Sequence, residues 1–247
     1  SVESGKNPIY AGGNGIANGN LATRTVVGEP IGEFYGYKVT GVFQTQAQVD
    51  QSPQKGTNTQ PGDFIYQDTN HDGSIDSKDR VVIGNPNPKI SYGFNTSFTY
   101  KQFDLTLDMQ GVADVDVYNA NIGFRFGGEN FTQDFYEHRW HGPGTSNTYP
   151  STNVGANNNS KPNSFFVESG AYFRVRNAQL GYTLPSVSLK KYGIQRLRVY
   201  ANAQNAINIF GYKGFTPEIG GAALSRGIDA DVYPLFATYN LGVNVTF

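Results

Sequence analysis

The fold of this chain is decided by the stretch Ile90-Ser91-Tyr92-Gly93-Phe94-Asn95-Thr96-Ser97-Phe98-Thr99-Tyr100-Lys101. Mostly apolar or aromatic residues occupy its even positions, and Ser, Gly, Asn, Thr or Lys occupy its odd positions. Successive side chains of a β-strand point to opposite faces of the sheet. The stretch therefore predicts a strand with one apolar face and one polar face.

The same pattern returns along the chain. After a tight connection, residues 103–110 alternate in the same way, with Phe103, Leu105, Leu107 and Met109 on one face, and predict the antiparallel partner. We expect further strands at 118–126, 165–168, 171–184 and 197–204. Segments rich in Asn, Gly and Pro separate them at 127–162, with a short helix expected at 133–140, and at 211–234. The sequence predicts an all-β, antiparallel fold.

This alternation is compatible with two environments, a soluble protein core and a lipid bilayer. Any antiparallel sheet with one buried face produces it. Three features favour a lipid bilayer. The strands approach the ~9–11 residues that a tilted crossing needs, aromatic residues such as Tyr92 and Tyr100 or Phe124 and Phe126 stand near the ends of apolar faces, and short connections alternate with long ones. Since only a closed barrel satisfies every backbone group in lipid, we predict a segment of a transmembrane β-barrel with long extracellular loops.

Composition supports strands and limits the partners. Of the 247 residues, 16% are charged, while 16 Tyr, 17 Phe and 30 Gly favour strands and turns. A net charge of -1 gives no field that would attract nucleic acid, and the absence of cysteine excludes disulfides and thiolate zinc sites. No run of about 18 apolar residues predicts a spanning helix. The sequence starts at Ser1, with neither an initiating Met nor a charged and then apolar leader. We therefore expect a piece of a longer protein.

The amino-terminal third is less regular. Residues 1–31 are rich in Gly and Asn without a period and are expected to be loop or linker. Residues 32–89 are expected to form an extracellular excursion: a strand at 34–43, a helical turn near 45–50, a linker, and an acidic loop. Residues 90–247 are then expected to carry the barrel strands.

The acidic loop, Asp68-Thr69-Asn70-His71-Asp72-Gly73-Ser74-Ile75-Asp76-Ser77-Lys78-Asp79, fits the twelve-residue calcium loop. A hard cation takes about 6 to 8 oxygen ligands, and a glycine at position 6 permits the sharp turn around it. The predicted ligands are the side chains of Asp68, Asn70 and Asp72, the carbonyl of Ser74, a water held by Asp76, and the closing carboxylate of Asp79. Position 12 departs from the pattern, with Asp instead of Glu. A structural Ca²⁺ is one interpretation; a metal-free Asx turn is the other.

The last residues alternate again. Tyr239, Leu241, Val243, Val245 and Phe247 share one face, and the sequence stops at Phe247. Such a terminal strand resembles the assembly signal that outer-membrane barrels present to the barrel assembly machinery, although a strand can also end in Phe by chance.

Several segments in consistent order resemble the carboxyl-terminal region of SusC-like, TonB-dependent transporters of Bacteroidota (the RagA/SusC family). They are 32–37 with 41–44, 68–80 with 82–88, 167–177 with 180–185, 197–200 with 204–205, 212–218, and 233–247. The resemblance implies the last part of a 22-stranded outer-membrane barrel with an internal plug, capped by a SusD-like lipoprotein, that imports glycans or peptides with energy from TonB. The plug and the TonB-contacting segment have no counterpart in these residues.

Other functions have less support in the sequence. An enzyme is poorly supported, because the histidines are His71, His138 and His141 and no catalytic elbow, phosphate loop or metalloprotease motif is present. A secreted, calcium-stabilised carbohydrate-binding β-sandwich is the main alternative, and a SusC-like scaffold subunit of an outer-membrane complex is another. Tyr136, Trp140 and Tyr149 are the candidate substrate contacts.

Overall fold

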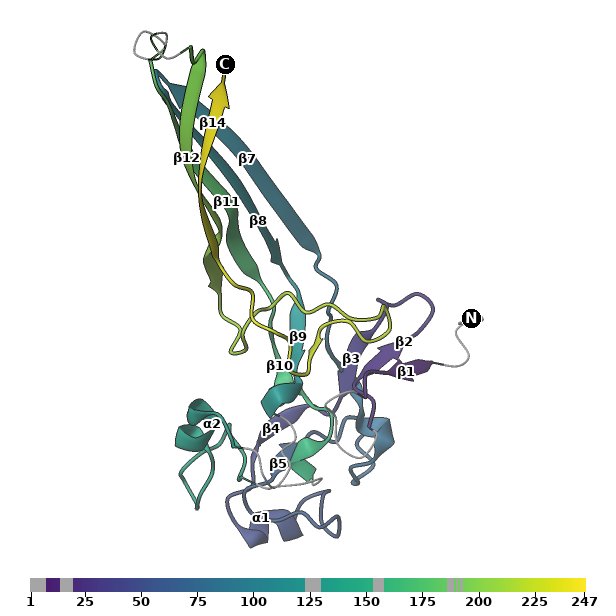
Figure 1. Ribbon diagram of the computed structural model, residues 1–247. Helices are drawn as coiled ribbons and strands as arrows, with labels where there is room; N and C mark the ends of the chain where they lie inside the picture. Colours follow the sequence, from purple (N-terminus) through teal and green to yellow (C-terminus); the bar gives the residue numbers. More distant parts are fainter. Residues whose placement is uncertain are drawn as a thin grey trace. The chain divides into compact units, whose positions relative to one another are not determined.

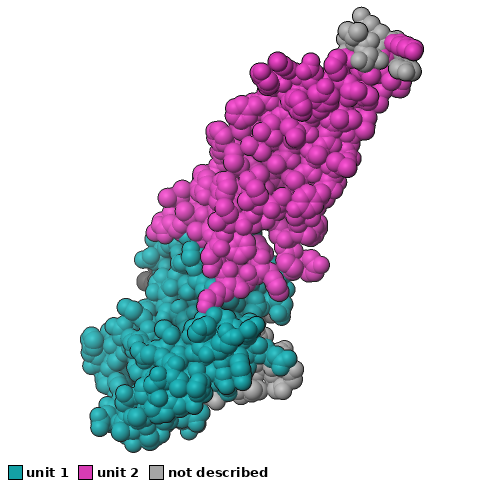
Figure 2. Space-filling model, turned by 90° about the vertical axis from the view of Figure 1, so that its left-hand side faces the viewer, with its two compact units in different colours: residues 1–87, 115–169, 218–232 teal, residues 88–114, 170–217, 233–247 magenta. Residues whose placement is uncertain are grey.

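The computed structural model describes residues 8–13, 20–122, 130–152, 158–185, 189, 191 and 193–247. The chain divides into two compact units, each built from three separate stretches (Figure 2). The first unit holds residues 1–87, 115–169 and 218–232, and the second holds 88–114, 170–217 and 233–247. Strands dominate and the helices are few and short. Among the described residues, no helix has the length and apolar character required to span a bilayer.

The second unit is a five-stranded antiparallel sheet with the order β14-β12-β11-β8-β7 (Figure 1). Its strands are β7 (Ile90–Tyr100), β8 (Phe103–Ala113), β11 (Tyr172–Thr183), β12 (Arg196–Phe210) and β14 (Thr238–Thr246). Lys101, with a φ of 55°, and Gln102 form the tight turn between β7 and β8. The predicted strands at 90–101, 103–110, 171–184 and 197–204 are confirmed, and the sheet as described is open rather than a closed barrel.

One irregularity interrupts the sheet. The register of β11 shifts between Val175 and Asn177 against both of its neighbours, β8 and β12. Against β8, Arg176 is the extra residue of a β-bulge, because Val175 and Asn177 pair with the consecutive residues Met109 and Asp108. Against β12 the extra residue is on β12, where Asn205 and Ala206 stand opposite Arg176.

The first unit has small sheets around an ordinary core. One sheet has the order β1 (Ile9–Ala11), β2 (Thr23–Thr25), β3 (Glu33–Gly36), β6 (Val81–Gly84). β4 (Val39–Val42) pairs with β5 (Phe64–Tyr66), and β9 (Asp116–Asn119) lies between β10 (Val167–Ser169) and β13 (Ile228–Asp229). The buried cluster consists of Ala22, Phe34, Val42, Phe64, Tyr66, Tyr118, Ala120 and Phe166.

The helices are short and capped. α1 (Gln46–Asp50) begins at Thr45, whose hydroxyl and Gln48 form a capping box. α2 (Gln133–His138) begins at Thr132, which accepts a hydrogen bond from Phe135 N–H. Both helical segments predicted from the sequence are confirmed. The 3₁₀ turns η2 (Ser77–Asp79), η3 (Ala120–Ile122), η4 (Asn158–Ser160) and η5 (Ser164–Phe166) complete the described elements.

Four expectations need correction. The strand expected at 165–168 begins as the 3₁₀ turn η5 and becomes the strand β10 only at Val167. Residues 1–31 are not all loop, because β1 and β2 pair there; three-residue strands are too short to show a period. The single strand expected at 34–43 is two strands, β3 and β4, which belong to different sheets. The strand expected at 118–126 ends at Asn119 and continues as η3, because Tyr118 and Ala120 pack into the core of the first unit. Phe124 and Phe126 lie outside the described residues.

Candidate functional site

The five-stranded sheet separates apolar from polar side chains. Paired residues of an antiparallel sheet share a face, and the register aligns Phe98 with Leu105, Leu105 with Leu180, and Leu180 with Ala201. This apolar face is open to its surroundings: Phe94 and Phe98 are each 60% exposed, and Leu241 is 88% exposed. A sheet of a soluble sandwich would cover such residues with a second sheet.

Aromatic residues stand at both ends of the apolar face. At the end of the β7–β8 turn, Tyr100, Phe103 and Tyr182 lie in register, and the ring centroids of Phe103 and Tyr182 are 4.8 Å apart. At the other end, Tyr92 and Phe173 both lie opposite Gly111. Apart from Tyr239, the intervening positions of β8, β11, β12 and β14 are mostly aliphatic or small; they include Leu105, Leu107, Ala178, Leu180, Ala201, Ala203 and Leu241. The alanines leave a shallow apolar hollow of about 550 Å³ between the leucines and Tyr239.

The opposite face is polar and linked by side-chain hydrogen bonds. Arg198 donates two hydrogen bonds to the carboxylate of Asp104. Its Nε donates to Oδ1 at 2.9 Å, and its Nη2 donates to Oδ2. Asn202 donates from Nδ2 to Oδ1 of Asn177 on β11, and Asn240 on β14 donates to Asn202. These two charged residues and three amides therefore satisfy one another across strands.

Glycines make room for the larger side chains of the polar face. A Cβ added to Gly181 would lie 2.3 Å from Nη2 of Arg198, and one added to Gly242 would lie 2.3 Å from Cζ of Tyr200. Arg198 reaches Asp104 by crossing Gly181, and Tyr200 lies over Gly242. These glycines are therefore needed for close packing, whereas Gly93 on the same face meets nothing nearer than the carbonyl oxygen of Met109 at 3.6 Å.

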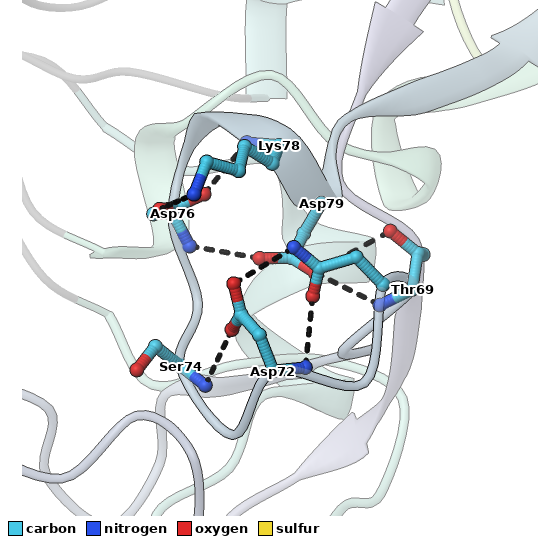
Figure 3. Close-up of polar contacts among 7 residues, drawn as sticks. Thr69, Asp72, Ser74, Asp76, Lys78 and Asp79 are labelled. Carbon is cyan, nitrogen blue, oxygen red and sulfur yellow. Dashed lines mark hydrogen bonds and ion pairs between the residues drawn. The ribbon is translucent and has the colours of Figure 1, made fainter.

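The acidic loop is a chain of turns in which side chains accept backbone hydrogen bonds (Figure 3). Asp68 Oδ2 accepts from Gly73 N–H at 2.9 Å, and Asn70 Oδ1 accepts from Asp72 N–H at 3.0 Å. Asp72 Oδ1 in turn accepts from Ser74 N–H at 3.0 Å. Gly73 has a φ of 80°, the left-handed conformation in which glycine carries no steric penalty.

Asp79 closes the loop from inside. It is fully buried, and its Oδ1 and Oδ2 accept from Thr69 N–H at 2.9 Å and from Asp76 N–H at 2.8 Å. Burial by itself would raise the pKa of Asp79, but hydrogen bonds from the backbone of Asp76, Thr69 and Asn70 outweigh it and hold the pKa below its usual value. Ile75 packs against the core of the first unit and anchors the other side of the loop.

The loop meets part of what a cation would require. Asp68 Oδ1 is buried and has no hydrogen-bond partner, and it is the first of the predicted ligand atoms. The other carboxylates are engaged by backbone N–H groups, and within the described part of the chain no group of three or more His, Asp or Glu side chains gathers where it could hold a metal. The hydrogen bonds described for the loop are those of consecutive Asx turns.

The candidate substrate contacts lie in α2 and the segment after it. Tyr136 is 59% exposed, and the guanidinium carbon of Arg139 lies 3.8 Å from the centre of its ring. Trp140 is held in place, because its Nε1 donates to Gln44 Oε1 at 3.1 Å and its ring lies against Gly62. Tyr149 donates its hydroxyl to Asp134 Oδ2 at 2.7 Å. Trp140 and Tyr149 thus have packing roles here, and Tyr136 offers the most accessible ring.

Gln44 was not singled out from the sequence. Its amide nitrogen donates to the carbonyls of Val42 and Ser146, and its amide oxygen accepts from Trp140 Nε1 and Gly144 N–H. One amide therefore ties the segment after α2 to the end of β4. No local pattern marks such a residue, because its partners are about 100 positions away in the chain.

No family model matches the chain. It is 31% identical to the TonB-dependent receptors P3 and P39 of Formosa agariphila, over 89% of this chain and 22% and 25% of theirs. It is 26% identical to the TonB-dependent receptor SusC of Bacteroides thetaiotaomicron, over 86% of this chain and 20% of that protein. The chain thus spans a quarter or less of these relatives.

Solved structures show the same fold. A chain in the structure of the RagAB peptide importer in the open-open state matches all of the present chain over 25% of its own length. The TM-score is 0.68 and the sequence identity is 19%. A second structure of the RagAB peptide transporter matches 92% of this chain and 24% of that chain, with a TM-score of 0.69. Together with the sequence relatives, these findings establish homology to TonB-dependent receptors of the SusC/RagA family over about a quarter of their length.

Proposed function

We propose that this homologue of SusC/RagA-family receptors forms part of the wall of an outer-membrane importer, with its apolar face against hydrocarbon and its polar face toward a water-filled interior. The observation that carries the proposal is the single sheet with an exposed apolar face, aromatic at both ends, and a hydrogen-bonded polar face behind it. At ~3.3 Å per residue, an 11-residue strand such as β7 is about 36 Å long. Tilted by about 45°, it covers the ~25 Å apolar band of a barrel.

The edges of the sheet support a larger assembly. β7 and β14 are its outer strands, and their unpaired backbone groups would be costly in lipid, where no water can satisfy them. We place this sheet in the carboxyl-terminal part of a 22-stranded barrel whose remaining strands, plug and TonB-contacting segment belong to the rest of the receptor. The alternating residues Tyr239, Leu241, Val243, Val245 and Phe247 would serve as the signal read by the barrel assembly machinery.

The relatives support a proposal for the cargo and the partners. One solved structure is named a peptide importer and one relative is SusC, so we propose uptake of peptides or glycans, driven by TonB and assisted by a SusD-like lipoprotein. The long segments at 127–162 and 211–234 would face the extracellular side, where Tyr136, and less directly Trp140 and Tyr149, would contact cargo. This role is transport and not catalysis.

The test compares neighbouring residues on the two faces. The chain has no cysteine, so spin labels can be attached at Phe98→Cys and Leu241→Cys on the apolar face and at Ser97→Cys and Asn240→Cys on the polar face, within the full receptor in liposomes. We expect the first pair to be accessible to oxygen and shielded from a water-soluble nickel chelate, and the second pair to show the reverse. Equal access to the chelate at all four sites would reject the barrel wall and favour the soluble carbohydrate-binding sandwich.

We further propose that the acidic loop binds one structural Ca²⁺ through Asp68, Asn70, Asp72, Ser74, Asp76 and Asp79. The motif spacing and the buried, unpartnered Asp68 Oδ1 support it. Calcium titrated into the chelator-treated receptor should release or absorb heat for about one equivalent per chain and should raise the unfolding temperature. Asp68→Asn should weaken binding at least tenfold, while Asp50→Asn, an exposed carboxylate at the end of α1, should not; an identical response in both variants would reject the site.

A further inference from the structure

The polar face of the sheet contains a hollow between β7, β8 and β11. It is lined by Gly93, Asn95, Asp108, Met109, Gln110 and Arg176 and encloses about 470 Å³. Gly93 forms an open floor, since nothing but a carbonyl oxygen lies within 4 Å of the place where a Cβ would be. The hollow is therefore space that no neighbouring side chain of the sheet fills.

The bulge in β11 places the positively charged side chain of Arg176 in this hollow. Because Val175 and Asn177 pair with consecutive residues of β8, Arg176 has no partner on β8, and its exposed side chain lines the polar hollow. The flanking residues keep their strand positions, with Asn177 opposite Asp108 and Val175 opposite Met109. A bulge conserves pairing on either side while re-aiming one residue.

The charges of the hollow are unsatisfied, in contrast to those nearby. Among the described residues, neither the guanidinium of Arg176 nor the carboxylate of Asp108 has an ion pair or a side-chain hydrogen bond. Asp104 and Arg198, on the same face, are joined by two hydrogen bonds. An Asp and an Arg that share a hollow without bonding each other leave both charges available to a third group.

We propose that this hollow is a cargo subsite in which Arg176 binds a carboxylate, while Asp108 and the amide of Asn95 bind hydrogen-bond donors next to that carboxylate. The proposal rests on the proposed function, because the polar face must line the import path. A guanidinium presents paired N–H donors that match both oxygens of a carboxylate. A neutral glycan has no carboxylate to pair with Arg176 and would need only hydrogen bonds from amide side chains. The carboxylate can belong to a peptide or to a uronic acid of a glycan.

The experiment measures selectivity for the carboxylate in the full receptor. Triglycine and triglycine amide form one pair of probes, and trigalacturonate and maltotriose form the other; each is titrated calorimetrically into wild-type and Arg176→Gln protein. We expect the wild-type receptor to prefer the carboxylate member of at least one pair, and Arg176→Gln to reduce that preference about tenfold. Arg176→Lys, which keeps the charge but loses the paired donors, should fall in between. The pair that responds identifies the source of the carboxylate.

Arg196→Gln is the matched control, because Arg196 is an exposed arginine on the same face at the far end of β12. The subsite is overturned if the wild-type receptor prefers neither carboxylate, if Arg176→Gln leaves the preference intact, or if Arg196→Gln removes it equally. The spin-label measurement decides the proposed function separately. Normal labelling of the two faces with a silent Arg176→Gln rejects only the subsite, whereas failed labelling rejects the barrel wall on which it depends.

Discussion

Aromatic and aliphatic residues are placed differently in the two units of this protein. In the first unit, Phe34 and Phe64 are completely buried and Tyr118 is 1% exposed, so the protein itself provides their apolar surroundings. In the five-stranded sheet of the second unit, Phe94 and Phe98 are 60% exposed. Burial of a large apolar side chain contributes about 1.5–3 kcal/mol. The first unit obtains that contribution internally, and the sheet must obtain it from another medium or partner.

The largest expected effect comes from removing a buried ring. Phe64→Ala should lower the free energy of unfolding by about 3–5 kcal/mol, because it leaves a cavity in the core of the first unit. Phe98→Ala on the apolar face should cost less than about 1.5 kcal/mol in liposomes, since lipid fills the space that the ring vacates. Urea unfolding of the receptor in liposomes measures both. Equal losses would mean that Phe98 is packed against protein and would remove the difference between the units.

A charge placed on each face of one strand sharpens the comparison. Leu241→Arg should destabilise the folded receptor by about 2–4 kcal/mol, the cost of arginine near the middle of a bilayer. Asn240→Arg, on the next residue and the opposite face, should cost less than about 1 kcal/mol because water solvates the charge. The readout is the denaturant midpoint in liposomes together with the yield of inserted protein. The reverse order would show that the faces are assigned the wrong way round.

The glycines of the sheet should differ in how much stability is lost when each is replaced by alanine. Gly242→Ala should cost about 1–3 kcal/mol, because its Cβ would lie 2.3 Å from the ring of Tyr200. Gly93→Ala, where the space is open, should cost less than about 1 kcal/mol. The double variant Gly242→Ala with Tyr200→Ala should recover part of the loss, which a thermal melt can detect. Absence of any recovery would exclude the ring as the cause.

The smallest expected effect is the pH dependence of stability in the first unit. Asp79 has a lowered pKa, so its contribution to stability is complete above the unfolded pKa of about 3.9 and is lost as the pH falls through the lower folded value. Burial raises the pKa of Asp63, whose contribution is instead present below the unfolded pKa and lost as the pH rises through the folded one.

Asp79→Asn should therefore lower the stability of the first unit by about 1 kcal/mol at pH 7 and flatten its loss below about pH 4. Asp63→Asn serves as the comparison, because its effect on the pH profile should have the opposite sign. Urea midpoints between pH 3 and 7 give both profiles. An unchanged acid limb in Asp79→Asn would show that the closing hydrogen bonds of the acidic loop do not depend on the charge.

The candidate sites were visible in the sequence to different degrees. The spacing from Asp68 to Asp79 predicted the turn at Gly73, because that turn joins residues close in the chain. Asp79 was predicted as the closing ligand of a cation, and in the structure its carboxylate accepts hydrogen bonds from Thr69 and Asp76. The rings of Trp140 and Tyr149 were predicted to be available, but the structure engages them with Gln44 and Asp134. Arg176 was not predicted as a contact, since a bulge depends on the registers of two partner strands.

What the sequence determined by itself is the two-faced character of β7, β8, β11, β12 and β14, because a period of two is a local property of the backbone and needs no partner to be recognised. Only the tertiary structure decided that Tyr118 enters a core instead of continuing a strand, that three-residue strands pair near the amino terminus, and that Arg176 lines a polar hollow. These outcomes depend on contacts between residues far apart in the chain, and each residue pattern is compatible with more than one partner until the chain is folded.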